Sequence, residues 1–443
     1  MKIKKLLSCV LSAALLSGCA QLGTNIESLV TPPKLSEEQT AIKQALINSV
    51  GNNVNLKYPK NGDYRSAYVI ADIDGEGNDE AVVFYEKTGV AASESVVRMA
   101  VLDKSADGNW NAVFDAVGDG ADVDKIIIGK LGENENTMIF VGYSVPATTD
   151  KKLSGYTYSE GKLNKIIGMD YVSADIADIS GNDGNELLVL ERGSENSYAK
   201  LFTIKGGKFT ILTQTEIALG ANGEYTAVSY GKVSENVTGA FLDIPNGDGT
   251  ISTQVLYCKG QALKNPIYQL QMNAGIDTMM KTVRPSKYTS MDINSDGIIE
   301  IPSLSVMPGY ETVADADKIY LTDWYHFDTD TLALAKKNSG YFSITDGYCL
   351  MLPSRWAGTV TVKEDATTDE VVFYKYAGDI NGDMTELLRV SVVDSGTSED
   401  KIRNGYTILS QNNQQEYCVK IPNNKTEALV PTKSELMYNF MLV

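Results

Sequence analysis

Three nine-residue segments of the chain carry oxygen-bearing side chains at one spacing. Positions 1, 3, 5 and 9 of the first segment are Asp72, Asp74, Glu76 and Glu80. In the second they are Asp178, Ser180, Asn182 and Glu186, and in the third Asp292, Asn294, Asp296 and Glu300. Oxygen ligands of this kind suit a hard cation such as calcium, which takes 6–8 of them at about 2.3–2.6 Å. The spacing therefore predicts cation-binding turns.

We expect each of these acidic loops to bind one Ca²⁺, with a backbone carbonyl at position 7 completing the side-chain ligands. These carbonyls belong to Asn78, Gly184 and Ile298. The alternative is a set of polar turns without metal, because Asp, Asn and Gly favour turns by themselves.

Strand-like runs lie on both sides of each acidic loop, and the same shape returns between the loops. Ile126–Val141 and Val228–Asp243 both read as strand, turn and strand, but Lys130 and Lys232 stand where the first acid would be. A lysine ammonium there would replace or exclude a cation, so we expect these two turns to bind none. The repeats start near residues 72, 130, 178, 232 and 292, at intervals of 48 to 60 residues.

Each interval contains about four strand-like runs separated by turn residues. In the first, these runs are Ser66–Ile73, Glu80–Glu86, Ser95–Leu102 and Trp110–Ala116. Four short strands per repeat are typical of a β-propeller blade. We therefore predict a mainly β chain, with at least five four-stranded blades over residues 65–340.

The acidic turn between two strands resembles the integrin-α-type FG-GAP (or VCBS) repeat. The resemblance implies a β-propeller with calcium in its blade loops. Two residues depart from the family pattern: Glu76 replaces a shorter acid, and Ser180 is a neutral ligand. The Asp292 loop is the best match. In a fourth segment, Asp379–Glu386, the turn glycine is replaced by Met384 and the glutamate comes one residue early. This favours an ordinary turn.

Residues 1–19 have the pattern of a targeting signal. Lys2, Lys4 and Lys5 precede an apolar run that ends in Leu16-Ser17-Gly18-Cys19. The ending resembles the bacterial lipobox, in which the cysteine, here Cys19, is lipidated. A diacylated anchor holds a protein to a membrane stably, so we expect an extracytoplasmic, lipid-anchored protein. Residues 20–35 read as a tether, and residues 36–64 as a capped helix with a lead-in to the sheets.

Residues 341–443 have a different character, with irregular strands and a short terminal helix. They are similar to small α+β modules of bacterial lipoproteins, and the alternative is one or two further blades. Cys349 and Cys418 both lie in this part. They could pair outside the cytoplasm, or remain two buried thiols.

Composition excludes several classes of protein. The net charge is −18, which argues against binding nucleic acid. The one histidine, His326, rules out multi-histidine zinc sites and leaves no more than one imidazole for catalysis. The 24 tyrosines and 3 tryptophans could line a sugar-binding surface, or could be explained by strand packing.

These observations predict a non-enzymatic surface lipoprotein that presents a calcium-stabilised β-propeller to a protein or glycan. Two alternatives stay open. One is a surface polysaccharide hydrolase that uses a carboxylate pair. The other is a structural component of the envelope.

Overall fold

The computed structural model describes residues 35–89, 96–133, 137–146, 151–159, 161–182, 184–274, 279–424 and 427–443. The predicted signal, Cys19 and almost all of the tether lie outside these residues. Within them, no helix has the length and apolar character needed to cross a membrane.

In the described part of the chain, six antiparallel sheets follow one another in sequence order. The first sheet contains β1 (Val54–Leu56), β2 (Tyr68–Ala71), β3 (Glu80–Lys87), β4 (Arg98–Lys104) and β5 (Trp110–Val117). The second contains β6 (Asp122–Gly129), β7 (Met138–Ser144), β8 (Lys151–Ser159) and β9 (Lys162–Tyr171). The third contains β10 (Ser173–Ala177), β11 (Glu186–Glu191), β12 (Ser197–Lys205) and β13 (Lys208–Ile217).

The three later sheets each have five strands. The fourth contains β14 (Ala227–Ser234), β15 (Val237–Pro245), β16 (Thr250–Lys259), β17 (Ala262–Lys264) and β18 (Arg284–Pro285). The fifth contains β19 (Ile301–Val306), β20 (Tyr320–Asp328), β21 (Ala333–Ser343), β22 (Tyr348–Met351) and the C-terminal β28 (Phe440–Leu442). The sixth contains β23 (Val360–Asp365), β24 (Glu370–Lys375), β25 (Thr385–Asp394), β26 (Thr407–Gln411) and β27 (Gln415–Lys420).

Helices are short and peripheral. Within the described ranges, the α-helices are α3 (Glu37–Val50), α4 (Pro266–Ala274), α5 (Glu399–Arg403) and α6 (Lys433–Asn439), and the 3-10 helices are η1 (Met279–Thr282), η2 (Asp315–Asp317) and η3 (Ser354–Trp356). Helix α3 begins at a capping box between Ser36 and Gln39, as expected from the sequence. Its buried residues Ile42 and Leu46 pack on the first sheet.

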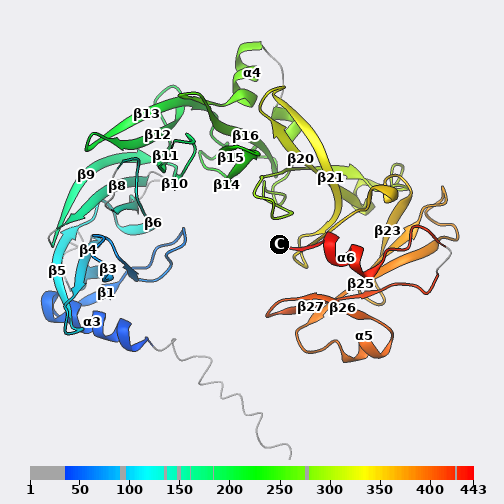
Figure 1. The fold of residues 1–443 in the computed structure, drawn as a ribbon, viewed down its shortest axis with the longest axis horizontal. Helices are drawn as coiled ribbons and strands as arrows, with labels where there is room; N and C mark the ends of the chain where they lie inside the picture. Colours follow the sequence, from blue (N-terminus) through cyan, green and yellow to red (C-terminus); the bar gives the residue numbers. More distant parts are fainter. Residues whose placement is uncertain are drawn as a thin grey trace, which may run out of the picture.

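Hydrophobic cores lie between consecutive sheets. Separate clusters of buried side chains join the first sheet to the second, the second to the third, the third to the fourth, the fourth to the fifth, and the fifth to the sixth. Figure 1 shows the sheets in chain order along an open arc. Among the described residues, no such cluster joins the sixth sheet to the first.

The prediction of a mainly β chain built from antiparallel sheets of about four strands is confirmed. The expected boundary at residues 340 and 341 lies within β21, which pairs with β22. Strand β28 then returns the C-terminus to the fifth sheet by pairing with β22. Residues 360–420 form a separate sheet, with α5 between β25 and β26.

The sixth sheet contains a buried carboxylate held by three donors. Glu370 Oε1 accepts from Lys401 Nζ at 2.7 Å and from the Tyr406 hydroxyl at 2.6 Å, and Oε2 accepts from Arg389 Nη1 at 3.0 Å. Burial alone would raise the pKa of Glu370, but these hydrogen bonds outweigh it and lower that pKa to about 2.

Because of this carboxylate, we expect the stability of the sixth sheet to fall at acidic pH. Because the folded pKa lies below the ordinary value of 4.5, its stabilisation is complete above that pH and is lost as pH falls towards about 2. We expect a loss of about 1–2 kcal/mol across this window once solvent screening is allowed for. Urea unfolding at several pH values, followed in wild type and Glu370→Gln, would measure it. An equally steep pH dependence in the variant would contradict the assignment.

Candidate metal centre

The three acidic loops occupy equivalent places in their sheets. Residues 72–80 connect β2 to β3, and residues 178–186 connect β10 to β11. Residues 292–300 follow Met291, whose bridge to Glu300 stands in for the first strand, and lead into β19. In all three loops the position-9 glutamate is buried: Glu80 is 0%, Glu186 3% and Glu300 0% exposed.

One carboxylate oxygen of each position-9 glutamate has the same backbone donor. Oε2 accepts from the N–H at position 2, which belongs to Ile73 at 2.8 Å, Ile179 at 3.0 Å and Ile293 at 3.1 Å. The first acid of each loop also accepts from backbone N–H groups within the turn. In each loop, the carboxylates at positions 1 and 9 are thus held by backbone N–H groups of the same loop.

The other oxygen of the glutamate distinguishes the loops. Glu186 Oε1 accepts from the hydroxyl of Ser180. Glu300 Oε1 lies 2.9 Å from Nε2 of His326. Glu80 Oε1 is buried and has no hydrogen-bond partner among the described residues. Leaving a buried carboxylate oxygen unpaired is costly, and the first loop lacks the contact to this oxygen that the other two loops contain.

The electrostatics of the first loop also favour a bound cation. Burial raises the pKa of Glu80 to about 7, and Asp74, Asp103 and Asp72 add to the rise, against the lowering effect of the Ile73 N–H. Oxygens of Asp72, Asp74 and Glu80 lie within 4.8 Å of one another. Among the described residues, no lysine or arginine forms an ion pair with these three carboxylates. A divalent cation would neutralise this cluster.

A further position, on the neighbouring strand, faces the glutamate in each repeat. The strand registers Ala81–Leu102, Leu187–Phe202 and Ile301–Tyr325 place Asp103, Thr203 and His326 opposite Glu80, Glu186 and Glu300. Sequence reasoning missed this position, because it depends on pairing between strands rather than on spacing within the loop. The sequence treats His326 as an isolated residue, whereas its half-buried ring contacts Glu300.

The remaining predicted loops differ from these three. The predicted turn near residue 232, in the segment Val228–Asp243, is a tight turn between β14 and β15. Lys232 lies within β14, and its backbone N–H donates to Gly297 O of the third loop at 2.9 Å. Glu386 of the fourth segment is held by Arg389 at 2.8 Å. Turn residues of the 130 copy and Asp183 of the second loop lie outside the described residues. Position 7 of the third loop, Ile298, forms a bridge to Lys232.

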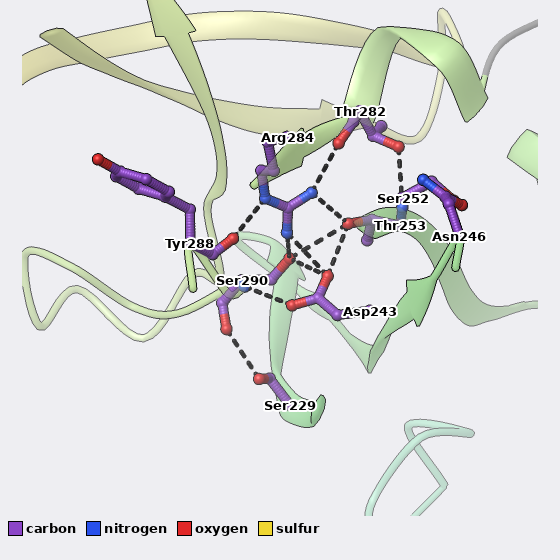
Figure 2. A network of polar contacts seen from close by, with 9 residues as sticks. All are labelled: Ser229, Asp243, Asn246, Ser252, Thr253, Thr282, Arg284, Tyr288 and Ser290. Atoms are coloured by element: carbon purple, nitrogen blue, oxygen red, sulfur yellow. Dashed lines mark hydrogen bonds and ion pairs between the residues drawn. The ribbon is translucent and has the colours of Figure 1, made fainter. Parts of the chain in front are cut away.

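A buried ion pair fixes the approach to the third loop (Figure 2). Arg284 and Asp243 are both fully buried, with Nη2 and Oδ1 2.8 Å apart. The guanidinium also donates to Thr253, Thr282, Tyr288 O and Ser290, so all five of its N–H donors are used. Burial lowers the pKa of Arg284, and Asp243 opposes that effect. Ser290 N donates to Asp243 Oδ2 at 2.6 Å, two residues before Asp292.

A cleft of about 970 Å³ lies between the fifth and sixth sheets. Aromatic side chains on its walls are Tyr288, Tyr310, Tyr320, Tyr341 and Phe342, and its lysines are Lys287, Lys318 and Lys363. The Tyr341 hydroxyl lies 3.2 Å from Glu364 Oε1. Elsewhere in these two sheets, Cys349 and Cys418 are free thiols.

No protein-family model matches this chain, and no curated protein matches it. Solved structures give partial superpositions. The exotype rhamnogalacturonan lyase YesX aligns with 11% identity and a TM-score of 0.29, over 71% of this chain and 61% of its own. A Bacillus licheniformis rhamnogalacturonan lyase aligns with 9% identity and a TM-score of 0.30, over 74% and 70%. A putative 6-phosphogluconolactonase from Bacteroides uniformis aligns with 10% identity and a TM-score of 0.33, over 75% and 94%. This chain spans less than two thirds of YesX, and these low scores assign neither family nor function.

Proposed function

We propose that this protein is a non-enzymatic, lipid-anchored surface protein whose propeller-like row of β-sheets is stabilised by calcium and binds a glycan or protein. The observation that carries the calcium part is the unpartnered, fully buried Glu80 Oε1 beside Asp72 and Asp74. A hard cation is the partner that such an oxygen cluster accepts. Its test is calcium-dependent stability, with Glu80→Gln as the diagnostic variant.

The cleft between the fifth and sixth sheets supports glycan binding in particular. Sugar rings pack on aromatic faces, lysine ammonium groups donate hydrogen bonds to sugar hydroxyls, and carboxylates accept hydrogen bonds from them. Tyr320 is half-buried at the edge of this cleft, at the start of β20. It therefore offers a ring that a ligand could cover without unfolding the sheet.

Loss of that ring should weaken glycan binding. We expect Tyr320→Ala to reduce the affinity for a bound oligosaccharide by roughly two- to tenfold, the range for losing one aromatic contact. Tyr438→Ala is the matched control, because Tyr438 is 81% exposed on α6 and does not line the cleft. The ligand would come from a glycan array, and affinities from calorimetry. Equal affinities for both variants would exclude this cleft as the binding site.

Lipid anchoring at Cys19 is a separate part of the proposal. We expect Cys19→Ser to abolish lipid attachment, leaving a precursor that is uncleaved or a protein released from the membrane. Metabolic labelling with a fatty acid, followed by membrane fractionation, measures this directly. Normal processing and continued membrane retention in Cys19→Ser would contradict lipidation at this residue.

A further inference from the structure

The carboxylates around the first loop fall into two sets that share Glu80. One set contains Asp72, Asp74 and Glu80, and the other contains Glu76, Glu80 and Asp103. Within each set the ligand atoms lie within 4.8 Å of one another, but the five together do not. Because calcium–oxygen distances are about 2.3–2.6 Å, ligands on opposite sides of one ion lie within about 5 Å. Each set therefore fits one ion better than the five residues together do.

Glu80 has the geometry of a bridging ligand. Its Oε2 is fixed by the Ile73 N–H at 2.8 Å, which orients the carboxylate. Its Oε1 is buried without a hydrogen-bond partner among the described residues, and Glu80 is the residue that the two sets share. A buried, unpartnered oxygen on the residue that two groups of carboxylates share is the independent sign that a cation belongs there.

Charge balance favours more than one ion. Among the described residues, none of the five carboxylates forms an ion pair with a lysine or arginine. One divalent ion would leave three of the five negative charges unbalanced, and two would leave one. Because close carboxylates repel one another strongly at a partly buried site, the second ion removes most of the remaining repulsion.

The second of these sets, which contains Glu76, Glu80 and Asp103 and is called the outer set, has a counterpart elsewhere in the chain. In the third loop, Asp296, Glu300 and His326 form a set at the same three places: position 5, position 9 and the cross-strand position. There the imidazole already contacts Glu300. In the second loop the cross-strand residue is Thr203, which carries no charge. The outer set is all-carboxylate in the first loop alone of the three.

We propose that the first loop binds two calcium ions bridged by Glu80, an inner ion at Asp72 and Asp74 and an outer ion at Glu76 and Asp103. This inference rests on the proposed calcium function of the same loop. The outer site uses a ligand from β4, so it ties the loop to the next strand of the sheet.

Counting bound calcium in the full chain tests this. The parent protein carries Asp178→Asn and Asp292→Asn, which should remove calcium binding at the second and third loops while keeping a hydrogen-bond acceptor at each position. Equilibrium dialysis should find two ions per chain in this parent. Asp103→Asn should lose the outer ion and Asp72→Asn the inner one, leaving one each. Asp103→Thr, which installs the residue found at the same place in the third sheet, is the second variant if Asp103→Asn folds poorly.

The outcomes are distinct. One ion in the parent, or two ions still bound to both Asp103 variants, would overturn the two-ion arrangement while leaving calcium binding intact. No ion in the parent would overturn calcium binding at the first loop, the site whose buried Glu80 oxygen carries the calcium part of the proposed function. Circular dichroism of each variant checks that its sheets are formed.

Discussion

Replacing Arg284 by methionine is expected to destabilise the protein by about 3–5 kcal/mol, the cost of leaving one partner of a buried ion pair without the other. Asp243 would be left without its guanidinium partner at a position with no exposure. Ser290 and Thr253 would lose a shared neighbour at the same time. The midpoint of urea unfolding, followed by tryptophan fluorescence, measures the loss.

A surface pair provides the control for this result. Arg98 and Asp115 also form an ion pair, at 2.6 Å, but their side chains are 22% and 28% exposed. Arg98→Met should therefore cost at most about 1 kcal/mol. Adding Asp243→Asn to Arg284→Met should recover part of the loss, because it removes the uncompensated charge. Similar small losses for both arginine variants would show that the buried pair is not a stabilising centre.

Chelating calcium is expected to lower the melting temperature by several degrees. A ligand that binds only the folded state stabilises it by about 2.7 kcal/mol at 100 times Kd, and 1 kcal/mol moves the melting temperature of a domain by roughly 2–4 °C. Extracellular sites often bind at about 10⁻⁴–10⁻³ M, so millimolar calcium would give less per site. Melting curves in chelator and in excess calcium give the difference. The measurement belongs above about pH 8, because a proton competes for Glu80, whose pKa is raised to about 7 by burial first and by its acidic neighbours next.

Glu80→Gln identifies the first loop as the source of that shift. In chelator the variant should be more stable than wild type, because a neutral amide removes one of the repelling charges and can still accept from Ile73. Adding calcium should raise the melting temperature of this variant only slightly. Glu186→Gln is the matched variant, since both oxygens of Glu186 already have partners, and it should keep most of the calcium shift. Identical curves with and without calcium in wild type would mean that the loops are acidic turns only.

Much of the fold could be predicted from local patterns. The strands on both sides of the first two acidic loops, the four-strand repeats and the cap of α3 depend on neighbouring residues, and the structure has them. The third loop has a strand only after it, because the bridge between Met291 and Glu300 takes the place of the strand before it. The expected helix from Ser36 is present because both partners of its capping box lie within one turn.

Features that depend on distant pairing could not be predicted. Asp103 reads as an exposed charge at a strand end, and only the register of β3 with β4 places it beside Glu80. The same holds for His326 and Glu300. Arg284 lies in the two-residue strand β18, and the burial of its charge depends on Asp243 from β15. The pairing of β28 with β22 brings the C-terminus back to the fifth sheet, which no local pattern indicates.

The row of cores between consecutive sheets has a consequence for how stability spreads through the molecule. Each sheet is supported by its nearest neighbours, so cooperativity decays along the row, as in repeat proteins. Among the described residues, the first sheet has such a neighbour on one side only, in addition to α3. It should therefore fray before the interior sheets do, and cation binding at its loop would protect amide hydrogens of β2–β5 from exchange while leaving those of the sixth sheet unchanged.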